Sequence, residues 1–471
     1  MELVEAALPR GLRDLLPGEM IARQRMIATI QRVYELYGFV PIASPAIEHL
    51  RVLAGSGGAE ASASIFRVQG PEDDPLGLRF DLTVPLARFM AQYPEIPRPF
   101  RRYQVGSVFR ADKPGPGRFR EFTQFDLDSV GTPSEIADTE IIAGMCDTLS
   151  ALEVGPFRVR FSSRRVLNLL MPLAGIDQGL AADVFRVLDK LDKIGIEKVR
   201  RELTTGYKDE SGDTITGVGL QMEQVSRIEK FLAIKGESRD EVLVGVRDVF
   251  SGVEGAAEAI DPLEKISRHL KALDYHEDRA VIDLSIARGL AYYTGPVFEA
   301  VLLDAPEFGS VFGGGRYDDL VMRFLGERVP ATGASIGVDR LLAALIKLGR
   351  TGTRKATAQI LVTTIDPSLM DDYLAITYEL RRAGVPTELY LGPESGLGKQ
   401  IKYADRAGIP LVLILGSDEK TKGIVTLKDL EAGAKGAAQL SQNRDQWRQL
   451  RPGQFEVART DLVKAAKDFS R

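Results

Sequence analysis

The chain has 471 residues, with 61 Lys and Arg against 66 Asp and Glu, a formal net charge of −5, and 44% hydrophobic residues. This composition indicates a globular protein of roughly two to four domains and argues against nucleic acid wrapping over its whole surface. The one cysteine, Cys146, excludes internal disulfides and fits a reducing cytoplasm, where we expect the protein to act. We expect no membrane partner, because no apolar run approaches the ~20 residues of a membrane span. The three histidines lie in no HExxH or Gly-x-Ser-x-Gly context, which disfavours zinc-protease and serine-hydrolase chemistry.

The sequence of the N-terminal part predicts a helix followed by extended segments. Apolar residues recur at spacings of three and four from about Met20 to Tyr37, and Gly38 ends the predicted helix. The segment FVPIASPAIEHL is extended, because each proline disfavours a helical residue before it. LGLRFDLTVPLARFM then predicts a strand ending near Asp81 to Thr83, with Pro85 opening a helix.

Residues 98–124, RPFRRYQVGSVFRADKPGPGRFREFTQ, predict a β-hairpin whose turn is the Pro/Gly run from Lys113 to Gly117. The hairpin is strongly basic, and guanidinium groups bind phosphate oxygens in pairs. Edge strands also carry solvated basic residues, so the pattern alone leaves phosphate binding and a basic edge strand both open. The basic residues are Arg98, Arg101, Arg102, Arg110, Lys113, Arg118 and Arg120.

The segment EFTQFDLDSVG that follows alternates polar and apolar residues. A strand there would place Gln124, Asp126 and Asp128 on one face, with Phe125 and Leu127 on the other. Residues from about 165 to 276 then read as a charged helical insertion. Strand signals return in AVIDLSIARGLAYYTGPVFEAVLL and VFGGGRYDDLVMRFLG, and GASIGVDRLLAALIKLG predicts a strand leading into a helix.

The C-terminal part follows a charged linker, GRTGTRK. QILVTTI, VPTELYL, PLVLILG and GIVTLKDL alternate with helical stretches, which predicts a small α/β domain in βαβ order. The residues alone therefore predict an α+β chain with a terminal βαβ domain. The run Gly313 to Gly315 lacks the spacing of a nucleotide-binding loop.

Four polar clusters recur in this order along the chain: Asp81 and Thr83, the hairpin through Asp128, Arg288 with Tyr292 and Tyr293, and Arg316, Tyr317 and Arg340. In their order along the chain and in their amino-acid sequences, these clusters resemble the histidyl-tRNA synthetases, which are class II aminoacyl-tRNA synthetases. PRGLRDLLPGE, GFVPIASPAIE, VFRADKPGPGRFREFTQFDLD and GASIGVDRL are similar to the opening and the three class II motifs. ARGLAYYTGPVFE and GGGRYDDL resemble the pair of stretches that marks histidine-specific members, and GKQIKYADRAGIPLVLILG resembles the anticodon-binding domain.

The resemblance implies an antiparallel-sheet catalytic domain of the class II type, interrupted by a helical insertion and followed by a mixed-sheet anticodon-binding domain. The expected boundaries are residues 1–165 and 276–348 for the catalytic domain, 166–275 for the insertion, 349–356 for a linker and 357–471 for the anticodon-binding domain. A homodimer is implied through the first motif. The implied partners are L-histidine, ATP and tRNA(His), with no DNA.

The implied reaction is that of a histidine–tRNA ligase. Histidine attacks the α-phosphate of ATP and expels pyrophosphate, and the acyl group then passes to the 3′ end of tRNA. By resemblance, Arg110 and Arg288 are the catalytic residues that hold the reacting carboxylate and α-phosphate. The implied ATP-binding residues are Arg110, Asp112, Arg118, Phe122 and Arg340. Mg²⁺ is expected with ATP, held mainly by phosphates and water, and its protein ligands are unknown.

Histidine has two ring nitrogens, so a selective pocket needs an acceptor and a second hydrogen-bonding group. Asp128 and Tyr293 take these roles by resemblance, and Asp81, Thr83 and Gln124 would bind the α-amino group. The implied histidine-binding residues are Asp81, Thr83, Arg110, Gln124, Asp128, Arg288, Tyr292 and Tyr293. Position 291 is Ala where the family usually has Asp, and Asp81 and Asp128 stand where many bacterial members have Glu.

A second class of function uses the same fold without catalysis. The regulatory subunit of ATP phosphoribosyltransferase in histidine biosynthesis is synthetase-like, but it typically lacks the C-terminal domain and key catalytic residues. This chain retains Arg288, the whole basic hairpin and residues 357–471. We therefore expect an enzyme rather than a regulatory partner.

Overall fold

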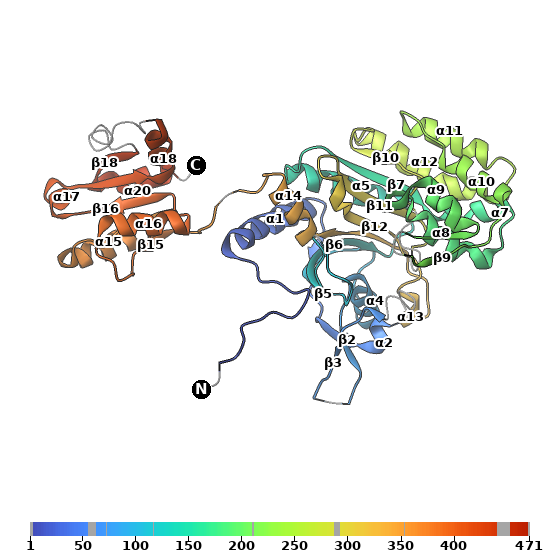
Figure 1. Cartoon of the computed structure of the whole chain (residues 1–471), viewed down its shortest axis with the longest axis horizontal. Helices are drawn as coiled ribbons and strands as arrows, with labels where there is room; N and C mark the ends of the chain where they lie inside the picture. The colour runs from blue at the N-terminus through green and yellow to red at the C-terminus, as the bar shows by residue number, and fades with distance from the viewer. Residues whose placement is uncertain are drawn as a thin grey trace. The chain divides into compact units, whose positions relative to one another are not determined.

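The computed structural model describes residues 3–54, 63–71, 73–115, 117–209, 212–286, 293–352, 354–439 and 453–469. These separate into two compact units, of which the first holds Met1–Asp14 and Arg25–Thr351 and the second holds Leu15–Gln24 and Gly352–Arg471. Each unit has its own sheet and its own core, and each is described by itself below (Figure 1).

An eight-stranded sheet forms the centre of the first unit, and its inner strands pair antiparallel as predicted. Its two outermost strands run parallel to their neighbours. In spatial order the strands are β1 (Val40–Pro41), β5 (Phe100–Phe109), β6 (Glu121–Val130), β13 (Ala331–Gly337), β12 (Ser310–Arg316), β11 (Pro296–Leu302), β7 (Phe157–Ser163) and β10 (Ala280–Ile282).

Helices pack on the apolar face of this sheet, two of them against side chains of β6. Tyr34 of α1 (Pro17–Leu36) packs edge-on against Phe125 of β6, with 5.1 Å between the ring centroids. α5 (Glu135–Ala151) lies so close to Leu127 that a Cβ on Gly144 would stand 3.5 Å from it. The buried Cys146 belongs to this helix, as the apolar run around it predicts. The opposite face of β6 is therefore left for polar side chains.

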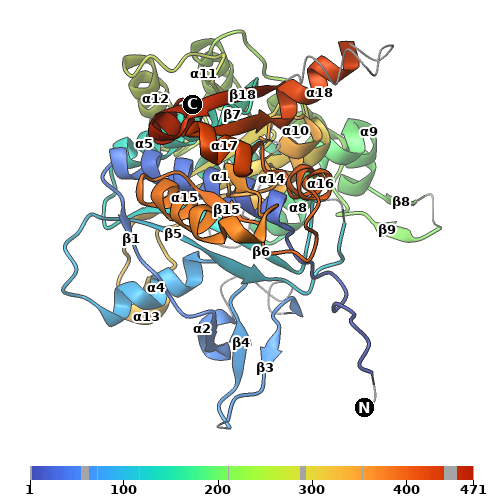
Figure 2. The ribbon, with the colours of Figure 1, turned by 90° about the vertical axis from the view of Figure 1, so that its left-hand side faces the viewer.

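A second, smaller antiparallel sheet lies in the first unit, and two of its strands lead into helices. It contains β2 (Ile47–His49), β4 (Leu76–Leu78) and β3 (Arg67–Val68), and it extends away from the large sheet in both views (Figures 1 and 2). α2 (Leu50–Leu53) follows β2, and α4 (Thr83–Gln92) follows β4. The strand predicted to reach Asp81 ends at Leu78, because the Asp81 carboxylate turns to accept a hydrogen bond from Val84 N at the start of α4, 3.0 Å away.

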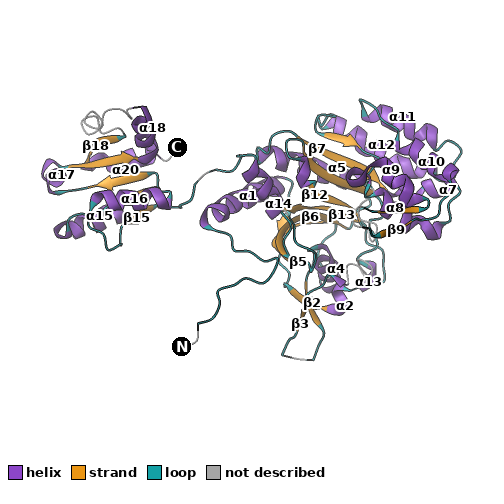
Figure 3. Ribbon diagram, in the orientation of Figure 1, coloured by secondary structure: helices purple, strands orange, loops and turns teal. Residues whose placement is uncertain are grey.

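The predicted insertion is helical, and its helices gather at one end of the first unit (Figure 3). It contains α6 (Arg164–Asn168), α7 (Leu170–Ala174), α8 (Ala181–Leu188), α9 (Leu191–Leu203), α10 (Met222–Leu232), α11 (Arg239–Val249) and α12 (Ala256–Ala272). The sequence pattern missed a short hairpin within it, β8 (Gly206–Lys208) with β9 (Thr214–Thr216). Gly206 has φ +80°, and a Cβ there would stand 2.7 Å from Gly217 N, so this hairpin depends on glycine at its open end.

The second unit is the predicted α/β domain. Its five-stranded sheet runs in the order β15 (Thr387–Leu389), β14 (Ile360–Val362), β16 (Leu411–Ile414), β17 (Ile424–Asp429) and β18 (Gln454–Ala458). α15 (Met370–Arg382) and α20 (Leu462–Phe469) pack on one face, and α16 (Leu397–Ala407) packs on the other. Across the described ranges, no helix is both long and apolar enough to cross a membrane.

A buried ion pair ties the large sheet to α5. Arg316 at the end of β12 is 4% exposed, and its Nη2 donates to Asp138 Oδ2 at 2.6 Å. The same guanidinium donates to the carbonyl oxygens of Thr132 and Ser134, which lie just before the helix. Asp138 is fully buried, so its charge depends on the Arg316 guanidinium, which also lies 3.5 Å from Asp318 Oδ1.

We expect Asp138→Ala to lower the free energy of unfolding by up to ~3–5 kcal/mol, because the buried Arg316 loses its nearest carboxylate and keeps the longer ion pair with Asp318. The measurement is urea unfolding followed by circular dichroism. Glu140→Ala on the same helix is the matched control, since Glu140 pairs with Arg101 at the surface and its loss should cost below ~1 kcal/mol. Equal losses in the two variants would show that the buried pair has no special role.

Candidate functional site

The polar face of β6 is aligned with its two neighbours by strand register. Arg102 and Gln104 of β5 stand opposite Asp128 and Asp126. On the other side, Gly333 and Ser335 of β13 stand opposite the same two aspartates. Asp126 and Asp128 are each 2% exposed. The alternation read from the sequence therefore places Gln124, Asp126 and Asp128 on one face, as predicted.

Asp128 is held from two sides. Its Oδ2 lies 2.8 Å from Arg102 Nη2, and its Oδ1 accepts a hydrogen bond from the Tyr317 hydroxyl. The carboxylate lies over Gly333, where a Cβ would come within 2.0 Å of Oδ1. Glycine is therefore required at this position of β13 if Asp128 is to keep its orientation. The same guanidinium lies 3.8 Å from Asp126 Oδ2.

Burial dominates the ionisation of the carboxyl groups here. Burial, with a smaller contribution from the charge of Asp128, raises the pKa of Asp126 to about 7 against the opposing effect of Arg102. Burial likewise raises the pKa of Asp128, although Arg102 and the Tyr317 hydroxyl favour its charged form. Burial also raises the pKa of Asp81, while Arg110 and Arg102 favour its ionised form. The site is thus a cluster of buried acids that depends on nearby arginines.

Two arginines of the hairpin bring the turn before α4 into this cluster. Arg102 Nη2 donates to Leu82 O at 3.3 Å, and Arg110 Nε donates to Phe80 O at 3.0 Å. Asp81, between the two carbonyl groups, is 8% exposed and caps α4 through Val84 N. The residues predicted to bind an amino group therefore lie beside those predicted to bind an imidazole, although 47 positions separate Asp81 from Asp128 along the chain.

The hairpin turn meets the start of α14 (Val338–Lys347). A Cβ on Gly117 would stand 3.9 Å from Arg340 Cγ, and Arg340 Nη1 donates to Ser310 O at 2.8 Å. Asp339 fixes this junction, because its Oδ2 accepts from Thr123 N at 2.6 Å. Among the predicted ATP ligands, the structure thus brings Arg340 to the hairpin turn. The side chains of Asp112 and Arg118 on that turn are exposed.

Arg110 lies over the Phe122 ring, with 5.1 Å from its Cζ to the ring centroid. Tyr293 packs at Gly315 of β12, where a Cβ would stand 3.0 Å from Tyr293 Cδ1. The Oε1 of Gln124 is buried without a hydrogen-bond partner in the described part of the chain. Gln124 also stands opposite glycines on both neighbouring strands, Gly106 and Gly337, and the Arg79 guanidinium lies over Gly106, where a Cβ would stand 2.4 Å from Arg79 Nη2. Arg288 and Tyr292 lie outside the described residues.

Three residues of this cluster were not among the predicted site residues: Arg102, Asp126 and Tyr317. The hairpin register carries a signal for Arg102, because pairing Phe109 with Glu121 places Arg102 opposite Asp128. Asp126 has the alternation as its signal, since it shares a face with Asp128. Tyr317 was named in one of the four polar clusters, but it lies 189 positions from Asp128, and no local pattern predicted their contact.

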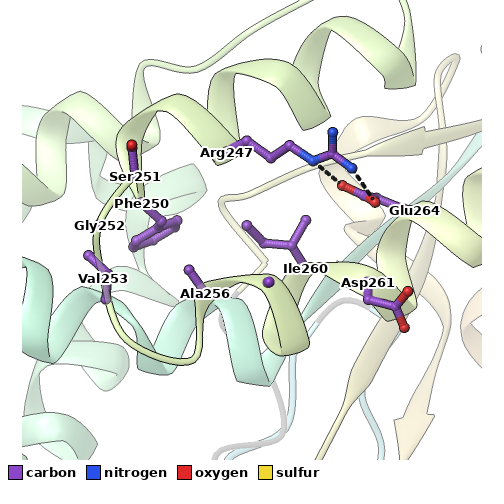
Figure 4. A pocket seen from close by; sticks show the side chains of 10 residues that line it. Arg247, Phe250, Ser251, Gly252, Val253, Ala256, Ile260, Asp261 and Glu264 are labelled. Carbon is purple, nitrogen blue, oxygen red and sulfur yellow. Dashed lines mark hydrogen bonds and ion pairs between the residues drawn. The ribbon is translucent and has the colours of Figure 1, made fainter.

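The described residues contain no group of three or more His, Cys, Asp or Glu side chains that could hold a metal ion. A surface pocket of about 510 Å³ lies elsewhere, between α11 and α12 (Figure 4). Phe250 and Ile260 form its apolar floor, and the ion pair between Arg247 and Glu264 lies at its rim. It shares no residue with the cluster around Asp128.

Known proteins match both units of this chain. A family model described as histidyl-tRNA synthetase matches residues 11–341, and one described as anticodon binding domain matches residues 359–448. A protein of Paracoccus denitrificans named histidine–tRNA ligase is 44% identical, with 98% of this chain and 96% of that protein aligned. A protein of the same name from Cereibacter sphaeroides is 43% identical, with 98% of this chain and 97% of that protein aligned.

Among solved structures, the histidyl-tRNA synthetase of a Nostoc species superposes with a TM-score of 0.82 at 33% identity, covering 99% of this chain and 100% of that one. A protein from Bacillus halodurans, titled as an ATP phosphoribosyltransferase regulatory subunit/histidyl-tRNA synthetase, superposes with a TM-score of 0.70 at 22% identity. It covers 85% of this chain and 97% of its own, and at that identity it shares the fold alone. With its matching family model and its full-length relatives, the chain belongs to the histidyl-tRNA synthetase family.

Proposed function

We propose that this chain is a histidine–tRNA ligase that works on the polar face of the large sheet. It activates L-histidine with ATP to histidyl-adenylate and pyrophosphate, and then transfers histidine to the 3′ end of tRNA(His). The observation that carries the proposal is the meeting of three separate segments around Asp128: the hairpin with Arg102 and Arg110, the turn at Asp81, and Tyr317 after β12.

On the phosphate side, Arg110 and Arg288 hold the histidine carboxylate and the α-phosphate. Negative charge accumulates at the phosphorus during attack, and fixed cations stabilise it most when they are placed in advance. The contacts of Arg110 with Phe80 O and the Phe122 ring support this role, because they fix its guanidinium. No general base is required, since a carboxylate is already ionised at neutral pH.

The rest of ATP lies along the hairpin. Arg118 and Arg340 bind the γ-phosphate end, and the approach of Gly117 to Arg340 supports this pairing. Phe122 and Arg340 enclose the adenine ring, with Asp112 near its exocyclic amine. Mg²⁺ accompanies ATP and is held mainly by phosphate oxygens and water, because it retains its hydration shell. Strand register aligns Glu299 of β11 with Asp126 across the large sheet, which makes it a second carboxylate to consider for Mg²⁺. Its carboxylate pairs with Arg160, however, so Glu299 fits poorly as a metal ligand.

On the histidine side, Asp128 accepts a hydrogen bond from the imidazole, and Tyr292 and Tyr293 close the pocket. Asp81, Thr83 and Gln124 bind the α-amino group. The Oε1 of Gln124 supports this role, because it is buried with no donor among the described residues, and such an acceptor suits an incoming ammonium group. A pocket of this kind rejects apolar isosteres, which would leave its polar groups unpaired.

The regulatory-subunit function is less well supported. The likeness to the Bacillus halodurans protein concerns the fold, whereas the relatives that align over nearly the whole chain are named histidine–tRNA ligase. We propose that residues 1–165 and 276–348 form the catalytic domain, with 166–275 as its insertion, and that 357–471 after the linker 349–356 bind the anticodon arm. We also place the enzyme in the cytoplasm, where its substrates occur.

Arg110→Ala should slow histidine-dependent ATP–pyrophosphate exchange by about 10²- to 10³-fold, as expected for losing one electrostatic stabiliser. Arg288→Ala should do the same while leaving the circular dichroism spectrum unchanged. Arg101→Ala is the matched control, because Arg101 lies on the other side of the same strand and pairs with Glu140. Exchange by wild type that is absent with histidine, or equal with another amino acid, would refute the proposed activity.

We further propose that the chain forms a homodimer through its first motif. β1 is an outer strand of the large sheet, and Val40 on it is 47% exposed, while Ile47 of β2, seven positions later in the same motif, is 46% exposed. An exposed apolar edge favours association, and a two-fold axis would bury it on both copies.

Sedimentation equilibrium should therefore give twice the 51.6 kDa of one chain. Val40→Asp combined with Ile47→Asp should shift the mass toward one chain, because charges would be buried in the interface. Val244→Asp on α11 is the control, since Val244 is 57% exposed and lies in the insertion. A wild-type monomer at micromolar concentration would contradict the proposal.

The anticodon role rests on α16. Lys399, Lys402 and Arg406 recur at spacings of three and four, which places them on one side of the helix. Lys399 already pairs with Glu394 at 2.6 Å, so Lys402 and Arg406 carry most of the positive charge.

Lys402→Glu with Arg406→Glu should raise the KM for tRNA and leave pyrophosphate exchange unchanged, with wild-type tRNA affinity falling as salt rises. Lys464→Glu with Lys467→Glu makes the same charge change on α20, which packs on the opposite face of the sheet. Equal effects of the two pairs on the KM for tRNA would argue against a site on α16.

A further inference from the structure

Arg102 is a charged side chain to which the reaction outlined above gives no role. It is 0% exposed and is among the largest fully buried side chains of the described residues. Burying a guanidinium is costly unless carboxylates and hydrogen-bond acceptors surround it. Here two carboxylates and one carbonyl oxygen do so, those of Asp128, Asp126 and Leu82.

The first consequence concerns the charge of Asp128. Burial raises the pKa values of Asp128 and Asp126, and Arg102 is the leading influence that lowers both. Two neighbouring buried carboxyl groups do not both ionise without a cation beside them. Arg102 therefore favours the ionised form of Asp128, in which both carboxylate oxygens are hydrogen-bond acceptors.

The second consequence concerns the orientation of Asp128. Arg102 contacts one carboxylate oxygen, and Tyr317 donates to the other, so the carboxylate plane is fixed from opposite ends. Each oxygen of an ionised carboxylate can accept more than one hydrogen bond, which leaves capacity for a further donor. Thus Arg102 orients Asp128 without using up its acceptor sites.

The third consequence concerns the distance between Asp128 and the turn at Asp81–Thr83. The same Nη2 that approaches Asp128 donates to Leu82 O, between Asp81 and Thr83. One rigid guanidinium therefore touches both the proposed imidazole acceptor and the turn that carries the proposed α-amino ligands. A planar fork with fixed donor directions defines such a separation better than an ammonium group does.

We infer that Arg102 is a positioning residue for histidine recognition, which fixes Asp128 relative to the turn at Asp81–Thr83 and so matches the pocket to the length of histidine. This inference rests on the proposed function, because it takes Asp128 and Asp81 as histidine ligands. It assigns to Arg102 an effect on histidine binding and none on ATP binding.

The test is pyrophosphate exchange with Arg102→Met, measured as separate KM values for histidine and ATP. We expect the KM for histidine to rise by about 10²-fold, as for a ligand displaced by about 1 Å, with the KM for ATP unchanged. Arg102→Lys should restore part of the affinity, since it keeps the charge but not the fork. Arg101→Met, on the opposite face of β5, should leave both KM values unchanged.

If Arg102→Met fails to fold, the double variant Arg102→Met with Asp126→Asn removes a buried carboxylate together with its cation. We expect this variant to fold and to show the same selective loss of histidine affinity by calorimetric titration. A folded variant whose KM for histidine stays within about threefold of wild type, or whose two KM values rise equally, would overturn the inference. Wild type without histidine-dependent exchange would instead refute the proposed function itself.

Discussion

The site depends on burying acidic side chains in the middle of a sheet, where each needs a partner at a fixed place. Antiparallel register supplies these places, because residues directly opposite each other lie close enough to interact. β5 sets Arg102 opposite Asp128 on one side, and β13 sets Gly333 opposite it on the other. A side chain at position 333 would collide with the Asp128 carboxylate, so the ion pair between Asp128 and Arg102 requires glycine at this position.

This arrangement links the site to the stability of the first unit. Tyr317 donates to Asp128, and the residue before it, Arg316, is fixed by the buried Asp138 at the start of α5. One end of β12 thus contacts the core helix and the polar face through adjacent side chains that point to opposite faces of the sheet. Loss of the Arg316–Asp138 pair would therefore disturb the orientation of Tyr317 as well as the packing of α5.

The arginines of the hairpin differ in their surroundings according to how far they lie from the middle of the sheet. Arg102 lies within the sheet and is surrounded by carboxylates, Arg110 lies at the strand end against Phe80 O and Phe122, and Arg118 lies on the exposed turn. The hairpin that reads as one basic segment in the sequence therefore contains three environments. Of these three, Arg102 is fully buried, Arg110 is partly buried and Arg118 is exposed.

Local pattern in the sequence was sufficient for the hairpin, for the face that Gln124, Asp126 and Asp128 share, and for the βαβ order of the second unit. Each follows from the period of the strand or from Pro and Gly in turns, which act between near neighbours. The end of β4 was predicted three residues late, because the Asp81 carboxylate caps α4, and side-chain capping competes with strand pairing. The short β8–β9 hairpin was missed for lack of apolar alternation.

The sequence by itself therefore determined the basic hairpin and the shared polar face of β6 and, through its motifs, the family. Only the tertiary structure decided which charges meet, namely that Asp128 lies between Arg102 and Tyr317 and that Arg102 also reaches Leu82. These contacts join segments separated by up to 189 positions, and they depend on strand order across the sheet. That order is set by burial of the whole apolar face, which no local stretch of sequence encodes.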